Sequence, residues 1–292
     1  SGFYVGVIDD NGGNDITSNT ISNNSEAGIY ISGSASSTTV SNNTVEYNGG
    51  SAQELLVPDG GNYNRLVIDG GTVKTIQGDI QIDSCFVMTN GDIDANSASI
   101  TLGLSELTPG ILSHTAGRIY NGSFARFYSS GVVADGAIEG MFPVGGASND
   151  RFLYLSSPVV AISKGGKVTV EHTDVASVSD VSFFDGVDEV QRRHDADWSI
   201  ETDVNIVGGL FNLNAGGTGH GLIGDLADLR LTLLNGVVGT HAAASGSITD
   251  PRLNRLGLSV AEINNSIYVG SIEKIGSPLP IELLSFSAVL ND

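Results

Sequence analysis

Two short segments decide the fold of this chain: residues 16–24 read ITSNTISNN, and residues 40–48 read VSNNTVEYN. Their apolar and asparagine positions repeat at an interval of 24 residues (40 − 16), which pairs Ile16 with Val40, Asn19 with Asn43, Ile21 with Val45 and Asn24 with Asn48. The same interval relates Val5 to Ile29 and Val7 to Ile31. A fixed period of this length is typical of a solenoid, in which each repeat stacks on the next.

The alternation inside each repeat predicts a right-handed parallel β-helix. In the runs 5–7 and 29–31, every second side chain falls on one face, as a strand requires. Asparagine tolerates the left-handed conformation of a corner, and its side-chain amides stack from rung to rung as a hydrogen-bonded ladder. We therefore expect a structural ladder formed by Asn19, Asn24, Asn43 and Asn48. Two rungs do not bury a core alone, so we also expect neighbouring rungs upstream of Ser1.

The remaining sequence predicts more β-structure, with two further patterns of strand length and spacing. From Asn62 to Gly103, short apolar runs are separated by Gly, Asn and Asp without the 24-residue interval, which predicts either shorter rungs or a meander. From about Met141, longer strands at 152–155, 166–170 and 229–233 predict an antiparallel sandwich. The predicted fold is all-β, with a parallel β-helix over 1–135, a β-sandwich-like domain over 136–276, and an exit linker leading to a next domain over 277–292.

The charge of the chain excludes two classes of partner. Lys and Arg number 13 and Asp and Glu number 33, which gives a net charge of −20, and residues 1–64 contain no Lys or Arg. Such a chain lacks the cations that bind nucleic acid or an anionic membrane surface. No run of 18 apolar residues is present for membrane insertion, and no signal peptide is visible at the start. An acidic surface rich in Asn and Thr suits an extracellular medium.

Several later phrases resemble a module of large secreted surface proteins of Bacteroidota. The run from Asn64 to Ile80 is similar to an "L-x-I-x-x-G-G-x-K-T-L-x-G-N-I" phrase, and 142–145 match an "F-P-V-G" element. The run from Leu279 to Ala288 is similar to the "L-P-V-E-L-x-x-F-x-A" phrase that precedes the sorting domain of type IX secretion substrates. The resemblance implies an adhesin-like architecture at the cell surface, export by type IX secretion, and no assigned chemistry.

Catalysis is not expected from the residues themselves. β-Helical lyases and hydrolases combine carboxylates with a Lys or Arg, which residues 1–64 lack. His194 lies with Asp195 and Asp197 beside Trp198, which we interpret as a strand edge whose Trp packs inward, and the Gly-rich run 216–221 as a flexible hairpin. Zinc-ligand spacing is absent from the five histidines, which are His114, His172, His194, His220 and His241.

Three smaller features complete the candidate sites. Oxygen ligands gather in one loop as a candidate calcium site, formed by Asp9, Asp10, Asn11 and Asp15, and the run 185–189 is a weaker candidate. The aromatic residues near Arg126 allow either sugar stacking or core packing, and they are Tyr120, Phe124, Phe127 and Tyr128. Cys85 is interpreted as a small buried hydrophobe.

These observations favour a non-enzymatic structural or adhesive module of a large extracellular protein, which acts as a stalk and presents surface loops. Its expected partners are neighbouring rungs of the same protein, surface glycans or copies of itself. No cofactor is expected apart from possible Ca²⁺. A carbohydrate-binding module or a β-helical polysaccharide lyase or hydrolase is the first alternative, and a subunit of an extracellular filament is the second.

Overall fold

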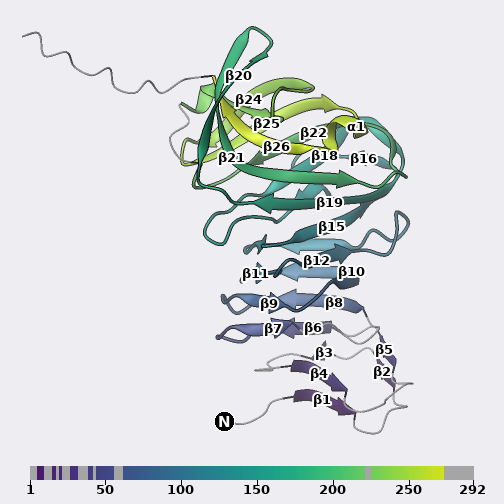
Figure 1. Cartoon of the computed structure of the whole chain (residues 1–292). Coiled ribbons are helices and arrows are strands. Elements are labelled where there is room, and N and C mark those ends of the chain that lie inside the picture. Colours follow the sequence, from purple (N-terminus) through teal and green to yellow (C-terminus); the bar gives the residue numbers. More distant parts are fainter. Residues whose placement is uncertain are drawn as a thin grey trace, which may run out of the picture.

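A computed structural model gives the arrangement of the chain (Figure 1). It describes residues 44–55, 62–220 and 225–272, and, for the first part of the chain, only the backbone of five short strands. These strands are β1 (Val5–Asp9), β2 (Asp15–Thr17), β3 (Thr20–Ile21), β4 (Ala27–Ile31) and β5 (Thr39–Ser41).

Parallel strands stack one above another in the lower part of the molecule, which confirms the predicted β-helix (Figure 1). One ladder starts at β3 and continues through β6 (Thr44–Tyr47), β8 (Tyr63–Ile68), β10 (Ile80–Met88), β12 (Ser99–Leu102) and β15 (Ser123–Tyr128). A second ladder contains β7 (Gln53–Leu55), β9 (Lys74–Ile76), β11 (Ile93–Asp94) and β14 (Ile119–Tyr120). The strand β13 (Ile111–His114) pairs with the end of β10.

The predicted 24-residue interval is confirmed for two strand pairs. Ile16 lies opposite Val40 between β2 and β5, and Ile21 lies opposite Val45 between β3 and β6. Between β1 and β4 the prediction is wrong, because Val7 lies opposite Ile29 at an interval of 22 residues (29 − 7). A shift of two residues keeps the same side chains on the same face of the strand, so the apolar pattern does not distinguish the two registers.

Residues 62–103 form shorter rungs rather than a meander. Leu66 lies opposite Val45 on one side and Phe86 on the other, at intervals of 21 (66 − 45) and 20 (86 − 66) residues. Alternate residues of these strands point inward, so Leu66, Phe86 and Met88 are fully buried. Cys85 points outward and is half-buried, which makes the prediction of a buried cysteine wrong. Each buried Leu, Phe or Met contributes about 1.5–3 kcal/mol relative to an exposed one.

The parallel ladder changes into an antiparallel sheet at β15. One edge of β15 pairs in parallel with β12, where Phe124 lies opposite Ile100, and the other edge pairs antiparallel with β19 (Gly166–Thr173), where Phe124 lies opposite Val170. The second ladder is extended by a bridge between Ile119 and Val144. The solenoid is thus closed by strands of the following part, which we call the head (residues 129–272).

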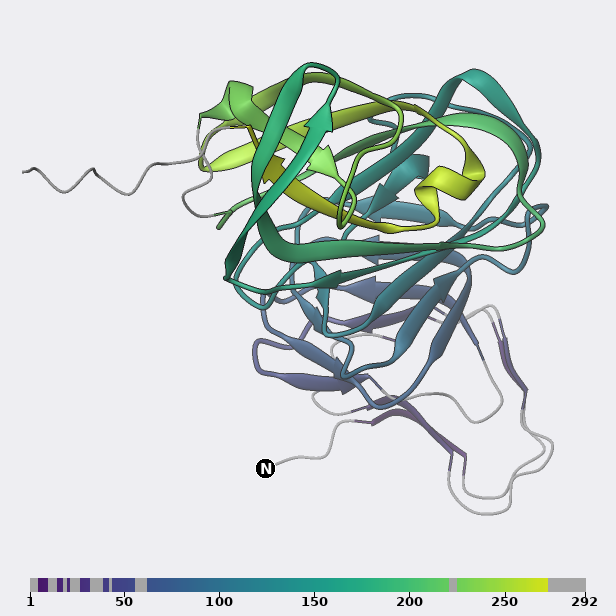
Figure 2. The same ribbon diagram turned by 45° about the horizontal axis from the view of Figure 1, so that its top comes forward.

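The head consists of two antiparallel sheets, as the sequence predicts, and Figure 2 shows its strands crossing over the top of the solenoid. The first sheet continues from β19 through β21 (Asp188–Thr202), β26 (Ser266–Ser271) and β23 (Leu229–Thr232), and β20 (Val178–Asp185) pairs with β21. The second contains β16 (Gly131–Val133), β18 (Leu153–Lys164), β22 (Val207–Gly216), β25 (Asp250–Leu258), β24 (Thr240–Ser247) and β17 (Met141–Phe142).

Helical structure is minor in the described residues. It comprises η1 (Ile138–Gly140), η2 (Leu226–Asp228) and α1 (Val260–Ile263), which begins with a capping box between Ser259 and Glu262. None of these helices has the length needed to cross a bilayer.

One hydrophobic core joins the solenoid and the head. The cluster of buried apolar side chains extends from Val45 to Val269. At the junction, the rings of Phe86 and Phe124 have centroids 6.0 Å apart, and those of Phe124 and Phe142 are also 6.0 Å apart. Aromatic pairs at this separation add about 0.5–1.5 kcal/mol beyond the area they bury. The two parts of the chain are therefore packed as one body.

Candidate functional site

The most unusual group of side chains lies inside the head, where one arginine and three histidines are buried together. Arg151 precedes β18, His172 lies on β19, His194 lies on β21, and His220 follows β22. Their relative exposures are 0%, 4%, 1% and 7%. Charged and imidazole side chains are rarely buried in such numbers without a specific reason. We call these four residues, with Asp174 and Trp198, the arginine–histidine cluster.

Strand alternation and register bring three of these side chains together. On β19, Val168, Val170 and His172 face inward, and on β21 His194 and Trp198 share the inward face. His172 lies directly opposite Trp198 in the antiparallel pairing of these strands. β21 pairs with β26 on its other side. The prediction of a strand edge at His194–Trp198 is therefore wrong, whereas the inward packing of Trp198 is confirmed.

A tight backbone contact brings His220 to the cluster. Gly217 donates a hydrogen bond to the carbonyl of Pro251 at 3.0 Å, and Thr218 donates one to the carbonyl of Asp150 at 3.1 Å. Gly217 has φ of +142°, and a Cβ there would lie 1.7 Å from the Asp150 carbonyl oxygen. Only glycine fits this position. Instead of a flexible hairpin, the described residues 216–220 form a close-packed segment that inserts His220.

The rings of the cluster contact one another around Trp198. The ring centroids of His172 and Trp198 are 5.1 Å apart, those of Trp198 and His220 are 5.9 Å apart, and those of His194 and His220 are 5.2 Å apart in an edge-to-face arrangement. The Trp198 Nε1–H donates a hydrogen bond of 2.7 Å to the carbonyl of Arg151. The Trp198 indole therefore holds the backbone of Arg151 against the histidines.

Asp174 is the carboxylate at the rim of the cluster. Its Oδ1 lies 3.8 Å from Arg151 Nη2 and 3.9 Å from His172 Nε2, and its Oδ2 accepts a hydrogen bond of 3.3 Å from Asn149. The adjacent His172 is the main group that lowers the pKa of Asp174, and Asn149 and Arg151 add to the effect. Asp174 is thus ionised at neutral pH and compensates the charge of Arg151.

Burial keeps the three histidines uncharged. Loss of solvation is the largest cause that lowers the pKa of His172 and of His194, and it lowers the pKa of His220 to about 2. Repulsion by the nearby Arg151 acts in the same direction at all three. Burial also lowers the pKa of Arg151, to about 10. Because this value is still well above 7, the guanidinium remains charged at pH 7. The cluster therefore presents one cation, one anion and three neutral imidazoles.

These pKa shifts predict an acid-labile head. The pKa of His220 is about 2 in the folded chain, against an ordinary 6.5, so below pH 6.5 the unfolded chain binds a proton that the folded chain does not. His220 therefore stabilises fully above pH 6.5, and its contribution is lost as the pH falls toward 2. Between pH 7.5 and 5.5 we expect urea denaturation to show a loss of about 1.4 kcal/mol from this residue. Replacement His220→Gln should flatten the pH dependence by that amount, and an unchanged pH dependence would contradict the assignment.

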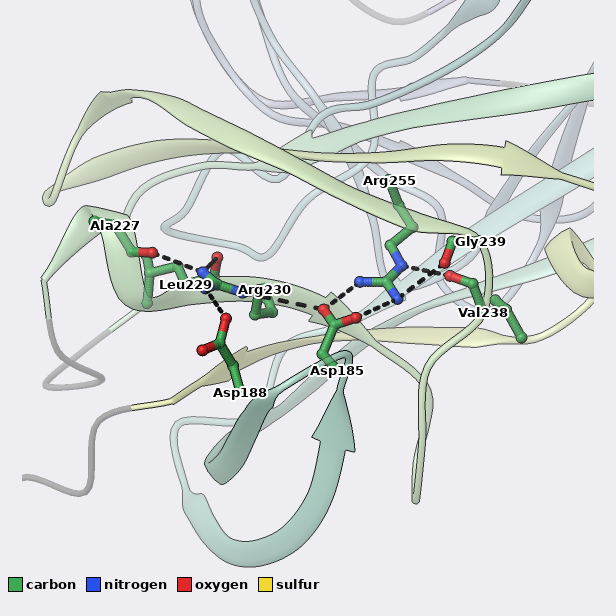
Figure 3. A network of polar contacts seen from close by, with 8 residues as sticks. All are labelled: Asp185, Asp188, Ala227, Leu229, Arg230, Val238, Gly239 and Arg255. Carbon is green, nitrogen blue, oxygen red and sulfur yellow. Dashed lines mark hydrogen bonds and ion pairs between the residues drawn. The ribbon is translucent and has the colours of Figure 1, made fainter.

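A second group of charged side chains connects the β20–β21 hairpin to the rest of the head through arginine–aspartate contacts (Figure 3). Arg255 donates to both carboxylate oxygens of Asp185, at 2.5 and 2.9 Å, and also contacts the carbonyl oxygens of Val238 and Gly239. Arg230 lies 4.0 Å from Asp185 and donates to Asp188 at 3.2 Å. Two of the three carboxylates of the weaker calcium candidate, Asp185 and Asp188, are therefore paired with arginine, and we interpret the group as a contact that fixes the hairpin in place.

The aromatic residues near Arg126 belong to the core. Phe124, Tyr128 and Tyr120 have exposures of 0%, 2% and 8%, and Phe127 is half-buried. Arg126 is itself buried, and it donates hydrogen bonds to the carbonyls of Ile138 at 2.7 Å and Met141 at 2.9 Å. Of the two interpretations of this group, core packing is the one that these positions bear out.

The calcium and asparagine predictions fall mostly outside the described residues. Asp9 and Asp15 lie in strands whose side chains are not described, and Asp10 and Asn11 lie outside the described residues altogether. Asn19, Asn24 and Asn43 of the predicted ladder also lie outside the described residues. Asn48 is described, and its side chain donates a hydrogen bond of 3.3 Å to Glu46 in the same rung. Within 44–55, 62–220 and 225–272, no group of three His, Cys, Asp or Glu side chains is arranged around a metal position.

Comparison with known proteins gives one partial match. Residues 2–68 match the family described as "Periplasmic copper-binding protein (NosD)". No curated protein and no solved structure matches the chain. Copper binding, which that description names, does not fit the donors present, because residues 2–68 contain no His, Cys or Met, the side chains with nitrogen and sulfur donors suited to copper. The match thus concerns the repeat architecture, and residues 2–68 form a NosD-like parallel β-helix region.

Proposed function

We propose that this chain is a non-enzymatic structural and adhesive module of a large extracellular surface protein. Its solenoid acts as a stalk, and its head closes the solenoid and presents surface loops. The observation that carries this proposal is the strand β15, which belongs to the parallel ladder and to the antiparallel sheet at once. Because the sheet and the core pass through the junction without a linker, load applied to the head is transmitted directly into the stalk.

The distribution of charge supports an exported location. Among the described residues no Asp or Glu is buried, whereas six cationic side chains are: Lys74, Arg126, Arg151, Arg193, Arg230 and Arg255. The outer surface is therefore more acidic than the net charge of −20 alone indicates. Such a surface repels nucleic acids and anionic lipids and resists nonspecific association. The periplasmic description of the matching family agrees with export.

The resemblance to Bacteroidota surface proteins adds an export route and a cellular location to this proposal. Phrases such as 142–145 resemble theirs, and 142–145 lie where the head covers the second ladder of the solenoid. In that form, the chain is exported by type IX secretion and carries its adhesive loops at the outer cell surface. Surface glycans and further copies of the same protein are the partners of those loops.

A combined binding and hydrolysis experiment tests the proposal. The full chain is applied to a glycan array and incubated separately with acidic and neutral polysaccharides, while released reducing ends are measured and the particles are imaged. We expect rod-shaped particles with a broader head, and no release above that of a heat-unfolded sample. Binding without release supports an adhesive module, and filaments in the images support self-assembly. Release of reducing ends by the folded chain would show an enzyme and overturn the proposal.

A further inference from the structure

The arginine–histidine cluster contains more buried hydrogen-bond donors than acceptors. Among the described residues, none accepts a hydrogen bond from Nε, Nη1 or Nη2 of Arg151, although this side chain is fully buried. Both ring nitrogens of His172 and both of His220 are likewise without a hydrogen-bond partner in the described part of the chain. We propose that this cluster is a binding site for a small carboxylate monoanion.

Asp174 alone does not satisfy these donors. A guanidinium carries five N–H groups, and the carboxylate of Asp174 lies 3.8 Å from it, beyond hydrogen-bond distance. The distance from His172 to the same oxygen is 3.9 Å. Asp174 thus compensates charge at a distance while the donors stay unpaired. A buried donor without an acceptor is destabilising, and more so when it is charged, so a cluster of such donors favours the binding of an added acceptor.

The chemistry of the donors defines the class of ligand. The planar guanidinium of Arg151 matches the two oxygens of a carboxylate in a forked pair. The neutral imidazoles of His172 and His220 each offer one further N–H without adding charge. Arg151 and Asp174 together carry no net charge, so a monoanion introduces less uncompensated charge than a dianion such as phosphate. A cation is disfavoured by the charge of Arg151 itself.

The surroundings limit the size of the ligand and the side from which it enters. The rings of His172 and His220 both pack against Trp198, so the surroundings of Arg151 are closely packed and favour the smallest carboxylates. The side chain of Asp174 is 31% exposed, whereas that of Arg151 is fully buried, so the rim at Asp174 is the side closest to solvent. A bound carboxylate there connects the segment before β18 with β19 and with the end of β22, which stabilises the head as a unit.

Thermal unfolding of the full chain tests this proposal. Sodium formate is titrated at pH 7.5 against sodium chloride at constant ionic strength, with sodium acetate as the larger carboxylate and sodium phosphate as the dianion. We expect a saturable rise of the unfolding temperature with formate, a smaller rise with acetate, and none specific to phosphate. In Arg151→Lys the affinity for formate should fall at least tenfold, because an ammonium does not form the forked pair. The matched control is Arg252→Gln, a partly exposed arginine that pairs with Asp250 at 3.3 Å and should leave the response unchanged.

A spectroscopic measurement covers the case in which Arg151→Lys does not fold. In the unaltered chain, formate should shift the ¹⁵N resonances of the Arg151 side chain and of the His172 and His220 rings, and chloride should not. A response to formate that is linear, or that chloride reproduces, would overturn the proposal. An absence of any shift would also overturn it, because ordered water then satisfies these donors.

Discussion

Replacing Asp185 by alanine is expected to lower the free energy of unfolding by about 3–5 kcal/mol. The Asp185 side chain is 10% exposed, and the Arg255 side chain that holds both of its oxygens is 2% exposed. Arg230, with 7% exposure, lies on the other side of the same carboxylate. Removing Asp185 leaves two buried guanidinium groups short of the charge that compensates them, and that uncompensated charge is the source of the loss.

The strand that carries Asp185 also offers a matched control. Asp180 lies on β20 as well, but its side chain is 66% exposed and its ion pair with Arg192 is long, at 4.0 Å. Exposed pairs contribute about 0–1 kcal/mol, so Asp180→Ala should change the stability little. Both variants are compared by urea denaturation, followed through the fluorescence of Trp198, the single tryptophan of the chain. Equal losses in the two variants would show that the Arg255 pair contributes no more than a surface contact.

The fold was predictable where the sequence carries a local period. Ile16 and Ile21 pair with the residues that the 24-residue interval predicts. The segment between these two residues has the same length in both repeats. Val7 departs from this interval by two residues, a shift that leaves the alternating apolar pattern of the sequence unchanged. The prediction for Cys85 is wrong for a related reason, because the residue lies in an apolar run but the alternation turns it outward next to the buried Phe86.

The candidate site was predictable only in part, because its members come from distant strands. His194 and Trp198 are close in sequence, and the polar and aromatic residues of this short segment indicate a candidate site. Arg151, His172 and His220 reach them through antiparallel register and a glycine-dependent contact that no local pattern encodes. Alternation on β19, with Val168 and Val170 preceding His172 at intervals of two, was the one available signal that His172 points inward.

Replacement of Phe124 by alanine is expected to separate the unfolding of the solenoid from that of the head. Phe124 is fully buried on β15, and its ring lies between Phe86 of the solenoid and Phe142 of the head, with centroid distances of 6.0 Å to each. Truncation of a buried Phe costs about 3–5 kcal/mol, through lost burial and through the cavity that remains. Because this cavity lies at the junction, the loss falls on the contacts that couple the two parts.

Two probes detect this uncoupling. Trp198 lies in the head, so its fluorescence reports that part alone, whereas far-ultraviolet circular dichroism reports the strands of the whole chain. In the unaltered protein we expect coincident transitions in urea, as one cooperative unit requires. In Phe124→Ala the two transitions should move apart. The control is Phe184→Ala, on the β20–β21 hairpin with 64% exposure, which should leave the transitions coincident and the stability within about 0.5 kcal/mol. Coincident transitions in Phe124→Ala would mean that the shared sheet at β15 couples the two parts without the aromatic contacts, because its backbone hydrogen bonds are unaffected by the substitution.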